Sequence, residues 1–253
     1  DGYFMLLASP SVAEDVVNKT AKNIIFVLDR SGSMSGKKIE QSKKALEFVL
    51  TNLNEGDNFN IVDYDDRVEM YKPEIQRYTT ESYKAAINYV EGIRSGGGTN
   101  INDALVKSIA MFQDENRPNY ILFLTDGLAS SGITNEMQIA KNVVDANGIG
   151  ARIFAFGVGN DVNARLLDRL TSNNGGVTEY VKPHEDIEVA VADLYGNISS
   201  PVMTDIHVSF SNTDVRSMYP DKLPDLFKGG QLVWVGKYNK AGNNTITVTG
   251  KVG

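Results

Sequence analysis

Three short apolar runs constrain the fold of this chain more than any other feature of its sequence. Each is seven residues long, rich in β-branched or aromatic side chains and nearly free of polar interruptions: 23–29, 120–126 and 151–157. Runs of this kind are typical of β-strands that are buried on both faces, as in a parallel sheet covered by helices. We therefore expect a sheet with helices packed on both of its faces.

Helical periodicity fills much of the sequence between and beyond these runs. Apolar residues recur at helical spacing in six segments: 38–53, 80–93, 102–112, 136–144, 164–170 and 185–198. Because strands and helices alternate at the spacing of βαβ units, the pattern predicts a doubly wound, mostly parallel, Rossmann-like α/β sheet. One strand is an exception, since Asn60–Tyr64 and Arg67–Tyr71 are separated by Asp65 and Asp66 alone, which permits only an antiparallel hairpin.

The pattern changes after residue 200. Three segments there alternate apolar and polar residues, as strands with one exposed face do: 205–210, 231–238 and 244–249. Three strands are too few for a good sandwich, so Tyr3–Ala8 is a candidate fourth strand. For a chain of 253 residues, we predict a small β-sandwich-like module built from residues 1–20 and 200–253, with the α/β domain, residues 21–199, inserted between them.

Composition and charge exclude several function classes. The 32 acidic and 25 basic residues give a net charge of -7 with no basic block, which argues against nucleic acids and anionic membranes as partners. The absence of cysteine excludes thiol nucleophiles and zinc–thiolate sites, and two histidines make imidazole chemistry scarce. No apolar run approaches the roughly 20 residues of a membrane span. The chain opens at Asp1 without a signal-peptide pattern, so we expect a processed or excised piece.

Oxygen-bearing side chains gather at the carboxyl ends of the predicted strands, where open parallel sheets bind ligands. The first buried strand ends in Asp29 and is followed by Ser31 and Ser33, a later strand ends in Asp126, and Thr99 lies in a glycine-rich loop before a helix. Carboxylate and hydroxyl oxygens without sulfur or imidazole suit a hard cation such as Mg²⁺. The sequence therefore predicts a cation site at this edge of the sheet.

These residues resemble the metal-ion-dependent adhesion site of von Willebrand factor type A domains, which combines an Asp-x-Ser-x-Ser loop with a distant Thr and a distant Asp. Asp29, Ser31 and Ser33 match the loop, Thr99 matches the Thr, and Asp126 matches the Asp. The resemblance implies that the two serines and either Thr99 or Asp126 bind Mg²⁺ directly, with Mn²⁺ or Ca²⁺ as possible substitutes, and that the other residues act largely through water. It also implies an open coordination position that accepts a carboxylate from a partner.

The flanking segments resemble the inter-alpha-trypsin inhibitor heavy chains and their bacterial relatives. The similarity lies in residues 1–10, 53–62 and 219–227. In the heavy chains the flanks pair into a β-sandwich, which agrees with the split module predicted above. Heavy chains are secreted or surface proteins, so the resemblance implies an extracytoplasmic location: secreted, periplasmic or cell-surface.

The hypothesis that follows is a non-enzymatic, cation-dependent binding or adhesion module. The cation would capture a carboxylate or other anionic oxygen on a protein or another ligand. One alternative is a structural scaffold whose ion only stabilises loops. A less favoured alternative is a metal-dependent hydrolase, which needs a general base near the ion, and no histidine is positioned to serve as one.

Two further patterns receive weaker interpretations. The loop from Gly32 to Lys38 lies between a strand and a helix like a phosphate-binding loop, but its two glycines are separated by three residues where that motif needs four. Asp63, Asp65 and Asp66 are candidates for a second cation site, yet aspartates in a hairpin are more often turn residues. We expect neither pattern to carry the function.

Overall fold

The structure, a computed structural model, describes residues 2–9, 21–198, 201–220, 223–227 and 230–251. The chain forms two units, one made of residues 21–194 and the other of residues 1–20 together with 195–253. Segment 10–20, which belongs to the predicted β module, and the predicted domain boundary at residues 199–200 lie outside the described residues. The two units are described separately below.

The larger unit is built on a mostly parallel sheet. Its strands are β2 (Asn23–Asp29), β3 (Asn58–Tyr64), β4 (Val68–Met70), β5 (Gln76–Arg77), β6 (Asn119–Thr125), β7 (Arg152–Val158) and β8 (Thr178–Val181). They follow the order β4-β3-β2-β6-β7-β8, and β5 also pairs with β3. β2, β3, β6, β7 and β8 pair in parallel, whereas β4 and β5 run antiparallel to β3. The predicted hairpin and fold class are confirmed, with a second short antiparallel strand that the sequence pattern did not reveal.

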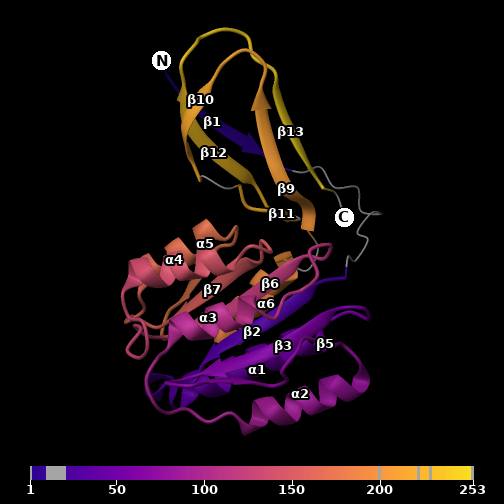
Figure 1. Ribbon diagram of the computed structural model, residues 1–253, viewed down its shortest axis with the longest axis vertical. Helices are drawn as coiled ribbons and strands as arrows, with labels where there is room; N and C mark the ends of the chain where they lie inside the picture. Colours follow the sequence, from indigo (N-terminus) through magenta and orange to yellow (C-terminus); the bar gives the residue numbers. More distant parts are fainter. Residues whose placement is uncertain (1, 10–20, 199–200, 221–222, 228–229, 252–253) are drawn as a thin grey trace. The chain divides into compact units, whose positions relative to one another are not determined.

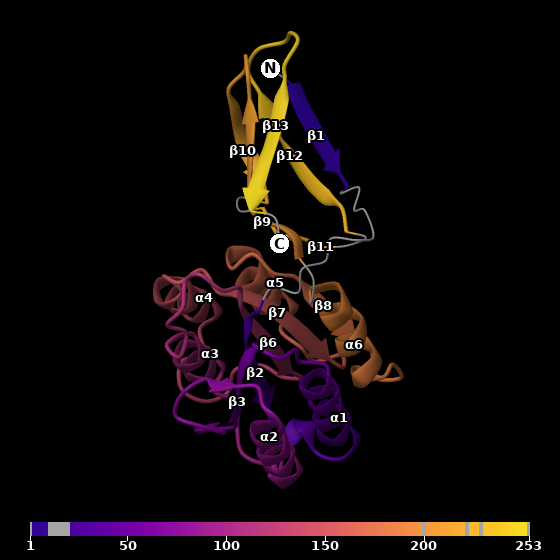
Figure 2. The same ribbon diagram turned by 90° about the vertical axis from the view of Figure 1, so that its right-hand side faces the viewer.

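Helices cover both faces of this sheet. They are α1 (Lys37–Thr51), α2 (Thr80–Gly92), α3 (Ile101–Ile109), α4 (Glu136–Ala146), α5 (Ala164–Asn173) and α6 (Ile187–Ile198). Figure 2 shows α3, α4 and α5 on one side of the sheet and α1 and α6 on the other. Every residue of β2 and β6 is buried, as the unbroken apolar runs predict for strands between two helical layers.

The first turns of the helices differ in how they are capped. Asn100, Asn135 and Asn163 each accept a hydrogen bond from a backbone N–H three residues further on, at the start of α3, α4 and α5. Side-chain caps of this kind satisfy N–H groups that have no partner within the helix. By contrast, α1 begins after Gly36 without a side-chain cap, although its first turn lies beside the predicted cation site.

The smaller unit consists of two three-stranded antiparallel sheets (Figure 1). One holds β1 (Gly2–Ala8), β12 (Leu232–Tyr238) and β10 (Val215–Tyr219), and the other holds β11 (Leu226–Phe227), β9 (Pro201–Phe210) and β13 (Ile246–Lys251). Phe4 of the first sheet packs edge-on against Phe210 of the second, with ring centroids 5.1 Å apart, and against Trp234 at 5.9 Å. The candidate strand at the start of the chain therefore forms, and it pairs with β12 from Gly2↔Tyr238 to Ala8↔Leu232.

The sequence pattern predicts three strands after residue 200, whereas the described residues in that part of the chain form five. The two additional strands, β10 and β11, are short, and β10 is interrupted by a register shift between Arg216 and Tyr219. Such strands have no regular alternation to detect. None of the helices in the described part of the chain combines the length and apolar character needed to cross a membrane.

Candidate metal centre

The candidate centre lies where the strand order reverses. β2 is followed along the chain by β3 on one side of it, while β6, the next long parallel strand, lies on its other side. Because the chain leaves β2 and β6 in opposite directions, their carboxyl ends flank the switch point of the sheet, and this is where open α/β sheets bind ligands. Asp29 ends β2, and Asp126 directly follows β6.

Asp29 is fully buried at the carboxyl end of β2. Its Oδ1 accepts a hydrogen bond from the Ser31 backbone N–H at 2.8 Å, and its Oδ2 accepts one from Thr125 Oγ1 at 2.6 Å. Burial raises the pKa of Asp29 above its usual range, and these hydrogen bonds oppose that rise. The hydrogen bonds therefore do not fully offset the cost of burying the ionised carboxylate, and a nearby cation would offset the rest.

The serine loop connects Asp29 to Asp126. Ser31 is buried, and its Oγ lies 3.1 Å from Ser33 Oγ. Ser33 Oγ in turn donates a hydrogen bond to Asp126 Oδ1 at 2.7 Å. Ser33 lies in the short 3₁₀ turn Gly32–Met34 and, unlike Ser31, is exposed. Four of the five predicted ligands thus form one continuous hydrogen-bonded network.

The glycine-rich loop that carries Thr99 is held against the serine loop by backbone hydrogen bonds. Gly32 N–H donates to the Gly97 carbonyl at 3.0 Å, and Gly96 N–H donates to the Arg30 carbonyl at 2.8 Å. Gly97 has a φ of 75°, and a Cβ there would lie 2.8 Å from an Asp66 carboxylate oxygen. The positive φ and the nearby Asp65–Asp66 turn therefore favour glycine at this position.

Thr99 completes the set beside Gly127. A Cβ built on Gly127 would lie 3.7 Å from Ser33 Oγ and 3.8 Å from Thr99 Oγ1, so both hydroxyls face the same glycine. The Thr99 backbone is fixed by Ser130, whose Oγ accepts from Thr99 N–H at 3.0 Å. The structure therefore brings all five predicted ligand residues to one edge of the sheet.

The donor set fits a hard divalent cation. It offers two carboxylates and three hydroxyls, without sulfur or imidazole, and Mg²⁺ commonly adds water to so few protein ligands. Within the described residues, no group of three or more His, Cys, Asp or Glu is arranged to hold a metal. A site at this edge must therefore rely on its hydroxyls. Occupancy by a particular metal stays a prediction.

Two residues of the centre escaped the sequence analysis. The sequence pattern identifies Thr125 only as part of a strand, yet its hydroxyl donates a hydrogen bond to Asp29. It identifies Lys38 only as part of an imperfect phosphate-binding loop, yet the Lys38 Nζ lies 2.5 Å from Asp126 Oδ2. The only available signal for Lys38 was its place at the start of the helix that follows the serine loop.

The three aspartates of the hairpin have protein partners of their own. Arg30 forms ion pairs with Asp63, at 2.6 Å, and with Asp65, at 3.1 Å. Asp66 accepts hydrogen bonds from the Gly98 N–H and from the hydroxyl of Ser131. These contacts fasten the hairpin to neighbouring loops, which favours the interpretation of these aspartates as turn residues rather than as a second cation site.

Comparison with known sequences gives one family and a set of similar proteins. The von Willebrand factor type A domain family matches residues 23–195. Inter-alpha-trypsin inhibitor heavy chain H4 of Bos taurus is 33% identical over 245 residues, which cover 94% of this chain and 26% of that protein. The human heavy chain H4 is 31% identical over 257 residues, covering 98% of this chain and 27% of that protein. The chain thus spans about a quarter of the length of these relatives.

Solved structures share the fold at low sequence identity. A von Willebrand factor type A protein from Catenulispora acidiphila has a TM-score of 0.77 at 14% identity, covering 99% of this chain and 70% of that chain. Proximal thread matrix protein 1 from the mussel byssus, described with a zinc-occupied MIDAS motif, has a TM-score of 0.57 at 18% identity, covering 75% of this chain and 47% of that chain. At these identities the similarity shows the fold alone.

Proposed function

Because the chain belongs to the von Willebrand factor type A domain family, matched over residues 23–195, we propose that it is a non-enzymatic, metal-dependent binding module. Asp29, Ser31, Ser33, Thr99 and Asp126 hold one divalent cation, with Mg²⁺ as the proposed physiological ion. The cation captures a carboxylate or another anionic oxygen presented by a partner, foremost a protein. By similarity to the heavy chains, we propose that this occurs outside the cytoplasm.

The observation that carries the proposal is the convergence of oxygen donors from three separate loops. Asp29, Ser31, Ser33 and Asp126 are joined by hydrogen bonds of 2.7 to 3.1 Å, and Thr99 faces the same glycine as Ser33. Helix capping alone does not require these hydroxyls to lie beside two carboxylates at the point where the strand order reverses. A cation explains why they do.

The charge of the chain agrees with capture of an acid through a metal. With a net charge of -7, the protein repels acidic partners in general. A divalent cation formally neutralises the two carboxylates of the site and remains electrophilic toward further oxygen ligands. Repulsion over the remaining surface would narrow the range of partners, since only a well-placed anionic group overcomes it.

Calorimetric titration with Mg²⁺ and Mn²⁺ tests the proposal, with Ser33→Ala as the site variant and Ser35→Ala as its matched control. Ser35 lies two residues further along the same loop, is also exposed, and bonds Ser95 Oγ at 2.9 Å instead of a carboxylate. We expect saturable one-site binding by the wild type and Ser35→Ala, and weaker binding by Ser33→Ala. The proposal fails if the wild type binds neither ion or if both variants bind equally well.

The same material separates binding from a purely structural role. If the ion only stabilises loops, the melting temperature rises with Mg²⁺, but the metal-loaded protein shows no response to a carboxylate such as acetate. If the site captures acids, acetate displaces water from the bound metal. Hydrolysis of ester or phosphate substrates that disappears in Asp126→Ala would instead revive the enzyme alternative.

A further inference from the structure

Lys38 places a positive charge directly on one of the proposed metal ligands. Its Nζ lies 2.5 Å from Asp126 Oδ2, while Ser33 occupies the other carboxylate oxygen, Oδ1, at 2.7 Å. The Asp126 side chain is completely buried, whereas 39% of the Lys38 side chain is exposed. Lys38 therefore lies between a buried carboxylate and the solvent. Arg30, a cation of the neighbouring loop, is engaged by the hairpin carboxylates instead.

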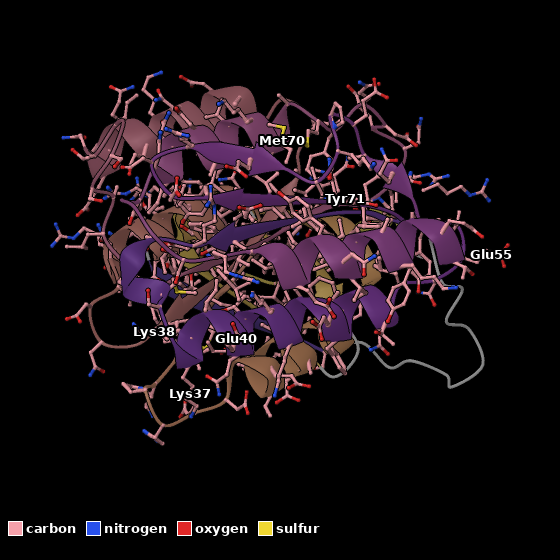
Figure 3. The ribbon with its side chains drawn as sticks, turned by 90° about the horizontal axis from the view of Figure 1, so that it is seen from below. Lys37, Lys38, Glu40, Glu55, Met70 and Tyr71 are labelled. Carbon is pink, nitrogen blue, oxygen red and sulfur yellow. The ribbon has the colours of Figure 1, made fainter. Side chains whose placement is uncertain are left out.

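The position of Lys38 within α1 is not one that helix stability favours. It is the second residue of the helix, after Lys37, and Gly36 provides no side-chain cap. Cations at a helix N-terminus are unfavourable, because the helix dipole is positive there. The ion pair with the Asp126 carboxylate offsets this unfavourable interaction with the helix dipole. Figure 3 labels both lysines at the start of α1.

The end of β7 leaves room for the ammonium group. Gly159 directly follows β7, has a φ of 95°, and donates its N–H to the Val181 carbonyl at 2.8 Å. A Cβ on Gly159 would lie 3.6 Å from Lys38 Nζ and 3.8 Å from its Cε. The end of the Lys38 side chain thus lies over Gly159, where no side chain stands between it and Asp126.

We propose that Lys38 is a specificity-determining residue that lowers the affinity of the site for divalent cations and raises the affinity of the loaded site for an acidic partner. This inference rests on the proposed metal-dependent function. Without Lys38, the formal charges of two carboxylates and one divalent ion cancel. With Lys38 in place, the loaded site keeps one net positive charge, which repels the ion but attracts the carboxylate of a partner.

The partner chemistry follows from this charge. A neutral oxygen ligand, such as a hydroxyl or amide, gains much less from the extra positive charge than an anionic oxygen does. The charge therefore favours an anionic partner group, which we take, as in the proposed function, to be the carboxylate of an acidic protein side chain. Lys38 acts on that group through the electrostatic field of the site and need not contact it.

The first arm of the test titrates Mg²⁺ and Mn²⁺ into the wild type, Lys38→Met and Lys37→Met. Methionine keeps most of the hydrocarbon stem and removes the charge, and Lys37 is an exposed neighbour on the same helix turn. We expect Lys38→Met to bind both ions about tenfold more tightly, an effect limited by the partial exposure of Lys38. Lys37→Met should stay within about twofold of the wild type. Melting curves in chelator, with Lys38→Gln as a second variant, verify that the variants fold.

The second arm adds acetate to each Mn²⁺-saturated protein and follows displacement of metal-bound water by the relaxation of water protons. Lys38→Met should need about threefold more acetate than the wild type or Lys37→Met. Equal metal affinities in all three proteins overturn the role of Lys38 and leave the proposed function intact. Tighter metal binding with unchanged acetate affinity overturns the role in partner capture. Absence of metal binding in every protein overturns both the inference and the proposed function.

Discussion

Thr125 should contribute to stability through its bond to a charged, buried group. Thr125 and Asp29 are both fully buried, and their oxygens lie 2.6 Å apart. Thr125→Val keeps the shape of the side chain and removes the donor, so Asp29 Oδ2 loses its side-chain partner. Loss of a hydrogen bond to a charged group costs about 1.5–3 kcal/mol. For a unit of this size, that corresponds to a fall in melting temperature of roughly 4–10 °C.

Thr171 offers a matched control for this measurement. It is also buried, but its hydroxyl bonds neutral partners, the Asp168 carbonyl at 3.2 Å and Thr178 Oγ1 at 2.9 Å. Urea denaturation in chelator should therefore show a smaller loss for Thr171→Val, about 1 kcal/mol. Calorimetric titration with Mg²⁺ should show weaker binding by Thr125→Val but not by Thr171→Val, because only Thr125→Val releases the Asp29 side chain. Equal losses of stability in the two variants would refute the view that Thr125 supports an ionised Asp29.

Three further outcomes are expected. Asp57→Ala should lower the free energy of unfolding by about 3–5 kcal/mol in urea denaturation. The reason is that the Asp57 carboxylate lies 3.0 Å from the buried Lys22 ammonium group, and the variant removes this ion pair. A loss below about 1 kcal/mol would show that water reaches the pair. Gly97→Ala should cost about 1–3 kcal/mol and weaken Mg²⁺ binding, because its positive φ and the nearby Asp66 oxygen force the loop to move; unchanged metal affinity would contradict the loop geometry. Burial raises the pKa of Asp63 above its usual range, so its contribution to stability is fully present below the ordinary carboxyl pKa and is lost as pH rises through the folded-state pKa. Asp63→Asn should therefore gain stability relative to the wild type as pH rises across this window, and a stability difference that does not change with pH would count against this expectation.

The sequence predicted the parts of the fold that depend on regular patterns. β2 and β6 read as unbroken apolar runs because both faces of each strand are buried, and the structure buries every one of their residues. The edge strand β8 (Thr178–Val181) was missed because two of its four residues are exposed and its pattern is too short to be periodic. Edge strands depend on pairing with a neighbour, which local sequence does not encode.

The candidate site was predictable to a different extent. The sequence identifies Asp29, Ser31, Ser33 and Asp126 at or just after strand ends and Thr99 in a glycine-rich loop before a helix, because all five match a spaced motif. The structure brings them together. Lys38 and Thr125 follow no such rule. Their roles arise from contacts with residues that are distant in the chain, at a separation of 88 positions for Lys38 and 96 for Thr125. The spacing of residues within one segment cannot reveal a contact between two distant segments.

The pairing of β1 with β12 determines the order in which the chain can fold. Gly2 lies opposite Tyr238, so β1 has no pairing partner until β12 has been synthesised. Residues 21–194 are contiguous and can fold during synthesis. Closing so long a loop costs little stability, because the entropy grows only with the logarithm of length, but distant pairing slows folding. Tyr3, Met5 and Leu7 are exposed even in the finished structure. Until β12 is synthesised, β1 is thus an apolar strand with unpaired edges, and it is the segment for which a chaperone would compete.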